Sequence, residues 1–352
     1  MSTESESEWA GWLPAAFNCG HRYPDRVSPA DAGRSVNAFY AGRYRHTEAA
    51  EWLQRLAAGE IERNGQPLRD DVALAVGDRL IWHRPPWQEA AVPALPGPLF
   101  DDGDLVVFAK PSGLPVLPAG GFLEHTLLRQ IERRVAAGDL DGAAGLPRPV
   151  HRLGRFTSGL LLCARRPATR AWLSAQLRES TAAHDPAGAR CHKTYRALLQ
   201  PPVAGSPLLD LAPGDGLELR TPIGRRPHAR LGSVWAAALP DGPPPLEARS
   251  SLCLLERGGT AIGGLPWLVE VTIATGRPHQ IRIHTAAAGA PLLGDPLYAP
   301  GGSPLEQALP GDGGYHLHAH RLRLPLPDGE ALELEAPLPE GLCPGAAAGA
   351  RG

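Results

Sequence analysis

Apolar and polar positions follow a helical period near the start of the chain. Four apolar residues recur at the spacing that places them on one face of a helix: Ala49, Ala50, Leu53 and Leu56. The Asn64-Gly65 pair that follows is typical of a tight turn between two short strands. We therefore expect residues 33–83 to form a small α/β unit, with residues 1–32 as an N-terminal extension.

After residue 99 the apolar residues instead form continuous runs of strand length. These runs predict strands at 105–109, 160–164, 195–200, 269–273 and 317–326. Two helices are expected between them, one that begins at Pro167 and one that begins at Pro278 and ends near Gly289. Many strands with few helices predict an α+β domain over residues 99–339, built on a central sheet that is mostly antiparallel or mixed.

The segment between the two patterns is rich in proline. Residues 84–98 contain five prolines, and such a composition favours an extended, semi-rigid linker. At the other end of the chain, residues 340–352 are mainly glycine and alanine. We expect them to form a disordered tail.

Charge gives information through its distribution rather than its sum. The net charge of −2 does not by itself indicate a nucleic-acid partner. Six arginines and no acid, however, lie within residues 148–170, and four more arginines lie within residues 220–230. Such clusters could follow a phosphate backbone, and a solvated surface is the alternative. Lys110 and Lys193 are the two lysines among 35 basic residues, which suggests that a compact ammonium charge matters there.

Cysteine spacing and hydropathy limit the class of protein. The five cysteines have no CxxC spacing, so we expect reduced thiols rather than disulfides or a zinc site. The first eight residues, MSTESESE, do not resemble a secretory signal, and no apolar run reaches the roughly 18 residues of a membrane span. We therefore expect a cytoplasmic protein without a membrane partner.

Two segments combine basic side chains with a turn. In VHRLGRFTSGLLLCAR, residues 150–165, a basic turn leads directly into an apolar strand. In TGRPHQIRIH, residues 275–284, a strand ends at a glycine and basic residues occupy the first turn of a helix. Free backbone N–H groups and the positive end of the helix dipole make that turn a natural anion site.

These segments resemble the signatures of the RluA-type RNA pseudouridine synthases, within the RsuA/RluA superfamily. The family motifs are HRLDxxTSG, KxYxA and TGRxHQIRxH, and this sequence has HRLGRFTSG, KTYRA (residues 193–197) and TGRPHQIRIH in the same order. The similarity runs from about residue 99 to residue 339. Residues 33–83 are similar to an S4-type RNA-binding domain, so the resemblance covers most of the chain.

The resemblance implies an isomerase that flips a uridine of ribosomal or transfer RNA into a cleft and converts it to pseudouridine without a cofactor. By the motifs, Tyr195 is expected to stack on the base and Arg277 to be the cation of the site. Gly154 occupies the position of the family's catalytic aspartate. The remaining RNA contacts are expected at Arg152, Arg155, Thr157, Ser158, Lys110, Lys193, His279, Gln280 and Arg282, and in the S4-like unit at Arg43 and Arg55. We expect a monomer.

Gly154 leaves the function open between two classes. A glycine has no carboxylate, and no acid lies between Gly142 and Arg178. A substitute carboxylate could come from elsewhere in the fold, with Asp101, Asp102, Asp104 and Asp295 as the candidates. The protein would then be a pseudouridine synthase with another acid or an altered mechanism. The alternative is a catalytically inactive RNA-binding relative that acts as an RNA chaperone or assembly factor.

Several single residues have structural alternatives. His316, His318 and His320 share one face of a strand, but no cysteine or acid joins them, so we expect no metal site. His151 could be a general base or a histidine that stabilises a turn. Tyr195 could be a core aromatic residue, and Arg277 could form a structural salt bridge.

Overall fold

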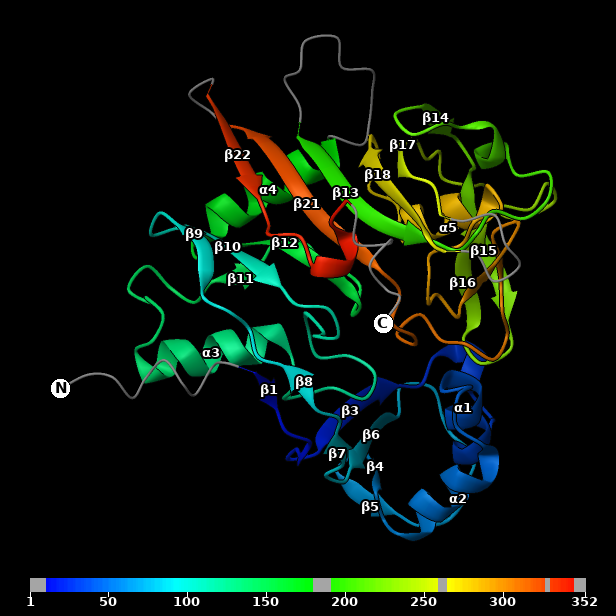
Figure 1. The fold of residues 1–352 in the computed structure, drawn as a ribbon. Coiled ribbons are helices and arrows are strands. Elements are labelled where there is room, and N and C mark those ends of the chain that lie inside the picture. The colour runs from blue at the N-terminus through cyan, green and yellow to red at the C-terminus, as the bar shows by residue number, and fades with distance from the viewer. Residues whose placement is uncertain (1–10, 180–190, 259–264, 327–329, 345–352) are drawn as a thin grey trace. The chain divides into compact units, whose positions relative to one another are not determined.

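The computed structural model describes residues 11–179, 191–258, 265–326 and 330–344. The chain divides into two compact units. The small unit consists of residues 15–90 and 227–234, and the large unit contains the other described residues. Figure 1 shows the elements of both units along the chain.

The small unit is a four-stranded antiparallel sheet with two helices. Its strands follow the order β3 (His21–Arg26), β6 (Arg79–Arg84), β4 (Ile61–Arg63) and β5 (Gln66–Leu68). Its helices are α1 (Val36–Arg43) and α2 (Ala49–Ala57). Asn64 and Gly65 have φ angles of 53° and 86°, which is the left-handed conformation that a two-residue hairpin turn requires, as the Asn-Gly pair predicts.

Aromatic side chains form the core of the small unit. The rings of Tyr40 and Trp52 stack with centroids 4.6 Å apart, and Trp82 meets Trp52 edge-on at 4.8 Å. Trp52 and Leu56 lie on the buried face of α2, four residues apart. These contacts bury α2 against strand β6, which carries Trp82.

The small unit is longer than residues 33–83. Strand β3 lies in the expected extension, but it pairs with β6 along its whole length. Its sequence, HRYPDR, lacks the apolar alternation that predicts a strand. The short strands β2 (Ala16–Phe17) and β7 (Gln88–Glu89) also pair with each other. The 3₁₀ turn η1 (Pro29–Asp31) lies between β3 and α1.

The second half of the proline-rich segment packs within the large unit. Val92 and Leu95 are fully buried, and β8 (Val92–Pro93) pairs with β1 (Trp12–Leu13). The buried side chain of Gln130 accepts a hydrogen bond from the Leu95 N–H at 2.7 Å and donates one to the Pro93 carbonyl at 3.1 Å. One glutamine thus satisfies backbone groups that the prolines keep out of a regular ladder.

A ten-stranded mixed sheet forms the large unit, as the α+β prediction states. Its order is β14 (Gly216–Leu219), β17 (Ser250–Glu256), β18 (Trp267–Ile273), β13 (His192–Leu199), β21 (Leu317–Pro325), β12 (Thr157–Ala164), β10 (Leu105–Lys110) and β9 (Pro98–Asp101). In addition, β11 (Arg148–Pro149) pairs with β12, and β22 (Ala331–Glu335) pairs with β21. Strands β12 and β21 run parallel, whereas the other described pairs of this sheet are antiparallel.

Two helices cover opposite faces of the strands β10 and β12. Helix α3 (Leu127–Ala137) packs Leu127 and Ile131 against one face, and α4 (Pro167–Glu179) packs Leu173 against the other. Every residue of β12 is therefore buried, which explains its continuous apolar run. Thr126 caps α3 by accepting from the Arg129 N–H at 3.3 Å.

Helix α5 (Gln280–Ala287) begins two residues after Pro278, because His279 adopts a left-handed φ of 55°. Smaller elements of the large unit are β19 (Tyr298–Ala299), β20 (Ser303–Pro304), η2 (Pro207–Asp210) and η3 (Glu340–Leu342). The hairpin of β15 (Ile223–His228) and β16 (Gly232–Ala237) has its tip, residues 227–234, in the small unit.

The start of the expected tail is ordered. Leu342 is buried against Leu198 and Leu268. Residues 345–352 of the expected tail lie outside the described residues. Within the described ranges, no helix is both long and apolar enough to cross a membrane.

Candidate active site

The turn that carries Gly154 leads into the parallel strand pair. Thr157 and Ser158, the first two residues of β12, pair with Leu317 and His318 at the start of β21. The Ser158 hydroxyl lies 2.8 Å from Nδ1 of His318, and both side chains are buried. Thr157 and Ser158 are therefore held against β21, where they fix the shape of the turn.

His151 is also part of this turn. Its Nε2 accepts a hydrogen bond from the Leu162 N–H at 3.0 Å. Burial, with the Lys193 charge as a smaller cause, lowers the pKa of His151 to about 3. A neutral acceptor bound to the backbone fits the alternative of a histidine that stabilises the turn.

Position 154 faces the hydroxyl group of Tyr315. Gly154 is exposed, but a Cβ atom built on its backbone would lie 2.2 Å from Oη of Tyr315 and 3.3 Å from Oγ1 of Thr157. The two oxygens are 3.3 Å apart and share a hydrogen bond. Tyr315 is 2% exposed, and its ring centroid lies 4.3 Å from the guanidinium carbon of Arg282.

Arg282 is locked in a buried ion pair. Its Nε and one terminal nitrogen donate to the two carboxylate oxygens of Asp295 at 2.7 and 2.8 Å, and another nitrogen donates to the Pro310 carbonyl at 3.2 Å. Burial, the largest single cause, lowers the pKa of Arg282, but the hydrogen bond to Asp295 together with the charges of Tyr315, Asp295 and Tyr298 raises that pKa overall. This geometry corrects two predictions. Arg282 is not available to RNA, and Asp295 is not a free substitute carboxylate.

Gln280 uses its whole side-chain amide inside the fold. Its oxygen accepts from the Thr275 hydroxyl at 2.7 Å and from the Arg277 N–H at 3.0 Å. Its nitrogen donates to the Arg249 carbonyl at 2.8 Å and to the Ser250 hydroxyl at 2.9 Å. The prediction that Gln280 contacts RNA is corrected, because these four bonds leave its amide no free capacity. Gln280 instead fixes the loop that carries Arg277.

Both lysines donate hydrogen bonds inside the fold. Lys110 is 1% exposed, and its ammonium group donates to the carbonyls of Pro111, Leu114 and Arg155 at 2.8 to 2.9 Å. Burial, with the nearby Arg155 charge, lowers the pKa of Lys110 to about 7. Lys193 donates to the Leu177 carbonyl in the last turn of α4 at 3.0 Å. The prediction that Lys110 contacts RNA is therefore corrected. Lys193 uses at least one of its N–H donors for a hydrogen bond inside the fold.

The Arg155 side chain is fixed by one hydrogen bond and by two aromatic rings. Its Nε donates to the Gly113 carbonyl at 3.0 Å, and its guanidinium lies over the rings of Phe122 and Phe156 at 4.5 and 5.0 Å. Burial lowers the pKa of Arg155, and the charge of Asp312 partly offsets that effect. Arg152, in contrast, is exposed.

Tyr195 and Arg277, which are expected to stack on the base and to be the cation of the site, differ in their surroundings. Tyr195 is half-buried beside the cluster that contains Tyr315 and Leu317, and Phe156 packs against the same cluster. Arg277 donates from Nε to the Glu247 carbonyl at 2.9 Å. In the described part of the chain, no carboxylate lies within ion-pair distance of the Arg277 guanidinium, so a structural salt bridge is not observed.

His279 links the loop to α5 in a strained conformation. Its left-handed φ of 55° is uncommon for a residue with a side chain, and such outliers concentrate at functional sites. Its Nδ1 lies 2.6 Å from the hydroxyl of Tyr298, which donates to the Trp235 carbonyl at 2.7 Å. Burial, then the charges of Arg282 and Arg152, lower the pKa of His279 to about 3. His279 is therefore neutral and lies near Arg152.

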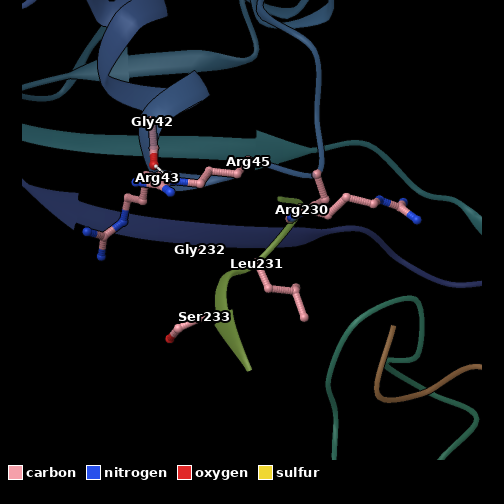
Figure 2. Close-up of a pocket in the computed structure, with 8 residues that line it drawn as sticks. Gly42, Arg43, Arg45, Arg230, Leu231, Gly232 and Ser233 are labelled. Carbon is pink, nitrogen blue, oxygen red and sulfur yellow. Dashed lines mark hydrogen bonds between the residues drawn. The ribbon is translucent and has the colours of Figure 1, made fainter. Parts of the chain in front are cut away.

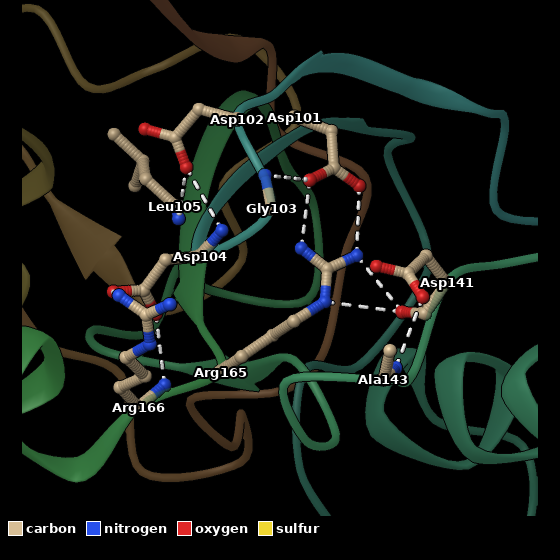
Figure 3. Close-up of polar contacts among 9 residues, drawn as sticks. All are labelled: Asp101, Asp102, Gly103, Asp104, Leu105, Asp141, Ala143, Arg165 and Arg166. Carbon is tan, nitrogen blue, oxygen red and sulfur yellow. Dashed lines mark hydrogen bonds and ion pairs between the residues drawn. The ribbon is translucent and has the colours of Figure 1, made fainter.

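Asp101, at the end of β9, and Asp102 and Asp104, in the turn before β10, already have hydrogen-bond partners, as Figure 3 shows. Asp101 forms a bidentate ion pair with Arg165 at 2.7 and 2.8 Å, and this hydrogen bonding lowers the pKa of Asp101. Asp102 accepts from the N–H groups of Asp104 and Leu105. Asp104 accepts from the Thr169 hydroxyl at 2.5 Å.

These three acids also lie at the wrong end of the sheet. Leu105 pairs with Ala164, whereas Lys110 pairs with Gly159, near the Gly154 turn. The five residue steps along β10 correspond to about 17 Å at roughly 3.4 Å per step. The prediction that Asp101, Asp102 or Asp104 could replace the missing carboxylate is therefore corrected, because these acids lie too far from the Gly154 turn.

In the small unit, basic residues line a cavity of about 430 Å³ (Figure 2). Its lining is Gly42, Arg43, Arg45, His46, Arg230, Leu231, Gly232 and Ser233. Arg43 lies 2.5 Å from the Asp25 carboxylate, yet its side chain remains 54% exposed. Arg55 does not line this cavity. It pairs with Glu51 and lies over the rings of Trp52 and Trp82, 4.5 Å from each centroid.

Comparisons with known proteins identify the family of the chain. A family model for RNA pseudouridylate synthases matches residues 104–287. An uncharacterized RNA pseudouridine synthase of Synechocystis sp. is 41% identical, over 86% of this chain and 93% of that protein. RNA pseudouridine synthase 5 of Arabidopsis thaliana is 35% identical, over 92% and 94%. Ribosomal large subunit pseudouridine synthase D of Neisseria meningitidis is 30% identical, over 84% and 72%.

The chain belongs to the RNA pseudouridine synthase family, a family of isomerases that act on RNA. The motif residues of that family accordingly divide into two groups here. Lys110, Gln280 and Arg282 are bonded inside the fold, whereas Gly154, Arg152, Tyr195, Arg277 and His279 stay predicted site residues. Sequence reasoning missed Tyr315, although it directly precedes the HLHAH segment.

Proposed function

We propose that this protein converts uridine to pseudouridine in a structured RNA, either ribosomal or transfer RNA. The observation that carries the proposal is that the loop after β18 presents Arg277 without a carboxylate partner among the described residues. A guanidinium in that state is suited to a phosphate of the RNA backbone. The relative named for the large ribosomal subunit supports ribosomal RNA as the first substrate to test.

In this proposal Tyr195 stacks on the flipped base. It is half-buried at the edge of an apolar cluster, and Phe156 lies beside the same cluster. An apolar edge with an aromatic ring favours an extruded pyrimidine over water. Arg152 and Arg277 supply positive charge for the flanking phosphates.

The cavity of the small unit adds a second contact with the RNA. Arg43 and Arg45 line it together with Arg230, and the resemblance of residues 33–83 to an S4-type domain favours RNA as the partner of this surface. Burial and neighbouring arginine charges, Arg230 first among them, lower the pKa of His46, which lines the same cavity. Several arginines around one cavity favour a phosphate as the bound group.

A second function is an inactive RNA-binding relative that acts as an RNA chaperone or assembly factor. The observation that favours it is the absence of a side chain at Gly154, together with the committed state of Asp101, Asp104 and Asp295. In this case the same surface would bind RNA, but no glycosidic bond would be broken.

Pseudouridine mapping separates the two functions. Purified protein is incubated with transcribed ribosomal and transfer RNA, and pseudouridine is located by chemical modification and primer extension. We expect pseudouridine at one or a few uridines, and its loss in Arg277→Ala. RNA binding without pseudouridine in any of these RNAs would establish the second function. The matched control is Arg257→Ala, because Arg257 donates to the Leu209 and Leu211 carbonyls away from the site.

A further inference from the structure

The Tyr315 hydroxyl fills the space that a side chain at position 154 would need. Gly154 is exposed, yet its side-chain direction leads to the Tyr315 hydroxyl, which is 2.2 Å from the Cβ position. A Cβ atom essentially never lies within 3.0 Å of a non-bonded heavy atom of a residue that is distant in the chain, so one of the two must shift. Any side chain at position 154 must therefore displace this hydroxyl or move the turn.

Tyr315 is held too firmly to move at small cost. Its ring lies under the Arg282 guanidinium at 4.3 Å, and Arg282 is fixed by both oxygens of Asp295. The backbone on either side of Tyr315 is bonded to one turn, because the Gly314 N–H donates to the Gly294 carbonyl and the His316 N–H to the Leu293 carbonyl.

Gly294 allows its turn to approach the backbone of Gly314 and Tyr315 closely. It has a φ of 78°, and a Cβ there would lie 2.9 Å from the Gly314 carbonyl oxygen and 3.5 Å from Cα of Tyr315. The turn that supplies Asp295 to Arg282 is thus in close contact with the backbone of Tyr315. Swinging the tyrosine ring away from Gly154 would disturb the Arg282–Asp295 ion pair.

We propose that Tyr315 is the positioning residue that determines which side chain position 154 can hold. Its hydroxyl fills the space where a carboxylate-bearing side chain would begin, so Gly154 and Tyr315 are a coupled pair. The inference rests on the proposed function for its catalytic meaning, since position 154 is where the family resemblance expects an aspartate. A Gly154→Asp change alone does not rebuild that aspartate, because the tyrosine hydroxyl is in its way.

Removal of one oxygen atom is expected to open the position. With Tyr315→Phe, the next ring atom is Cζ at 3.6 Å from the Cβ position, an ordinary van der Waals distance. Oγ1 of Thr157, at 3.3 Å, then becomes the nearest group. The double variant Gly154→Asp, Tyr315→Phe should therefore hold a carboxylate that the single variant cannot.

A stability cycle tests the coupling without reference to activity. The melting temperatures of the full chain are compared for Gly154→Ala, Tyr315→Phe and the double variant. Gly154→Ala should lower the melting temperature by roughly 3 to 8 °C. In the Tyr315→Phe background the same change should cost less than half of that. An equal loss in both backgrounds would overturn the proposal.

A second tyrosine under the same arginine provides the matched control. Tyr298 lies 5.1 Å from the Arg282 guanidinium carbon, but its hydroxyl bonds to His279 and Trp235 instead of facing Gly154. Tyr298→Phe should therefore leave the cost of Gly154→Ala unchanged. Relief of that cost by Tyr298→Phe would show general loosening, and the proposed pair would be rejected.

Pseudouridine formation tests the catalytic meaning. Gly154→Asp, Tyr315→Phe should form pseudouridine at least about tenfold faster than Gly154→Asp or Tyr315→Phe, a difference of about 1.4 kcal/mol in barrier height. Measurable but equal rates in Gly154→Asp and the double variant would overturn the proposal. If the melting temperatures show coupling while no variant and no parent protein forms pseudouridine, the proposed function fails and the pair stands.

Discussion

Arg282 and Asp295 form a bidentate ion pair whose side chains are 3% and 0% exposed. The pair joins α5 to the turn before Tyr298, and its guanidinium covers the Tyr315 ring. Arg282, which the sequence motif predicts as an RNA contact, thus stabilises the fold around the candidate site. Removal of one partner would leave the other charge buried without compensation.

Asp295→Asn should therefore lower the free energy of unfolding by about 3 to 5 kcal/mol. Urea unfolding followed by fluorescence measures this loss. The control is Glu333→Gln, because the Arg323–Glu333 pair is solvent-exposed and such pairs contribute about 1 kcal/mol or less. A loss below 1 kcal/mol in Asp295→Asn would contradict the role of the pair.

Acid should destabilise the large unit through its buried histidines. Burial lowers the pKa of His151 and His279 to about 3, and of His284 and His318 to about 4. In the unfolded chain these groups take up protons below about pH 6.5. Their stability contribution is complete above pH 6.5 and is lost as pH falls toward 3 to 4.

Urea unfolding between pH 7.5 and pH 4.5 measures this dependence. His284→Gln should reduce the slope of stability against pH, since His284 is fully buried between the Ser250 hydroxyl and the Thr221 carbonyl. His192→Gln, at an exposed position, is the control and should leave the slope unchanged. An unaltered slope in His284→Gln would show that its protonation is not linked to unfolding.

Arg277→Ala should weaken RNA binding and leave folding almost unchanged. The loss of one phosphate contact should reduce the slope of log affinity against log salt by about 1. Filter binding at several salt concentrations measures the slope. Lys110→Met provides the contrast, because its loss leaves three buried carbonyls without a donor and should lower stability instead. A Lys110→Met protein that folds normally but binds RNA weakly would contradict this division.

Arg43→Ala with Arg45→Ala should weaken binding to all RNAs by a similar factor, because phosphate contacts carry no sequence information. The salt slope should fall by about 2 for the double variant. Arg69→Ala is the control, since Arg69 donates to the Ala57 carbonyl and does not line the cavity. Unchanged affinity in the double variant would exclude the cavity as a phosphate site.

The sequence predicts the sheet better than it predicts the surroundings of the sheet. Expected strands at 105–109, 160–164 and 269–273 lie within β10, β12 and β18. Helix α3 was not expected, although Leu127, Ile131 and Val135 recur along it at helical spacing; what no spacing predicts is the burial of the polar side chains of Gln130 and Arg134. Their burial depends on backbone carbonyls of residues 93–96, about 40 positions earlier in the chain, which no local pattern contains.

The same limit applies to the candidate site. The motifs identify which segments meet, but they do not indicate which side chains point inward. Arg277 and Arg282 are equivalent as sequence letters, and the difference arises because Asp295 is within reach of one and not the other. Tyr315 could not be assigned to Gly154 from the sequence, because the two residues lie 161 positions apart in the chain.

The parallel alignment of β12 and β21 has a practical consequence for protein engineering. Both strands begin at the same end of the sheet, with Thr157 opposite Leu317, so the loops that precede the two strands lie next to each other. A chimera that takes residues 150–157 from a relative but keeps residues 310–317 of this chain would combine two loops whose side chains are not complementary. Transplanting the activity of another family member into this scaffold requires exchange of both loops together.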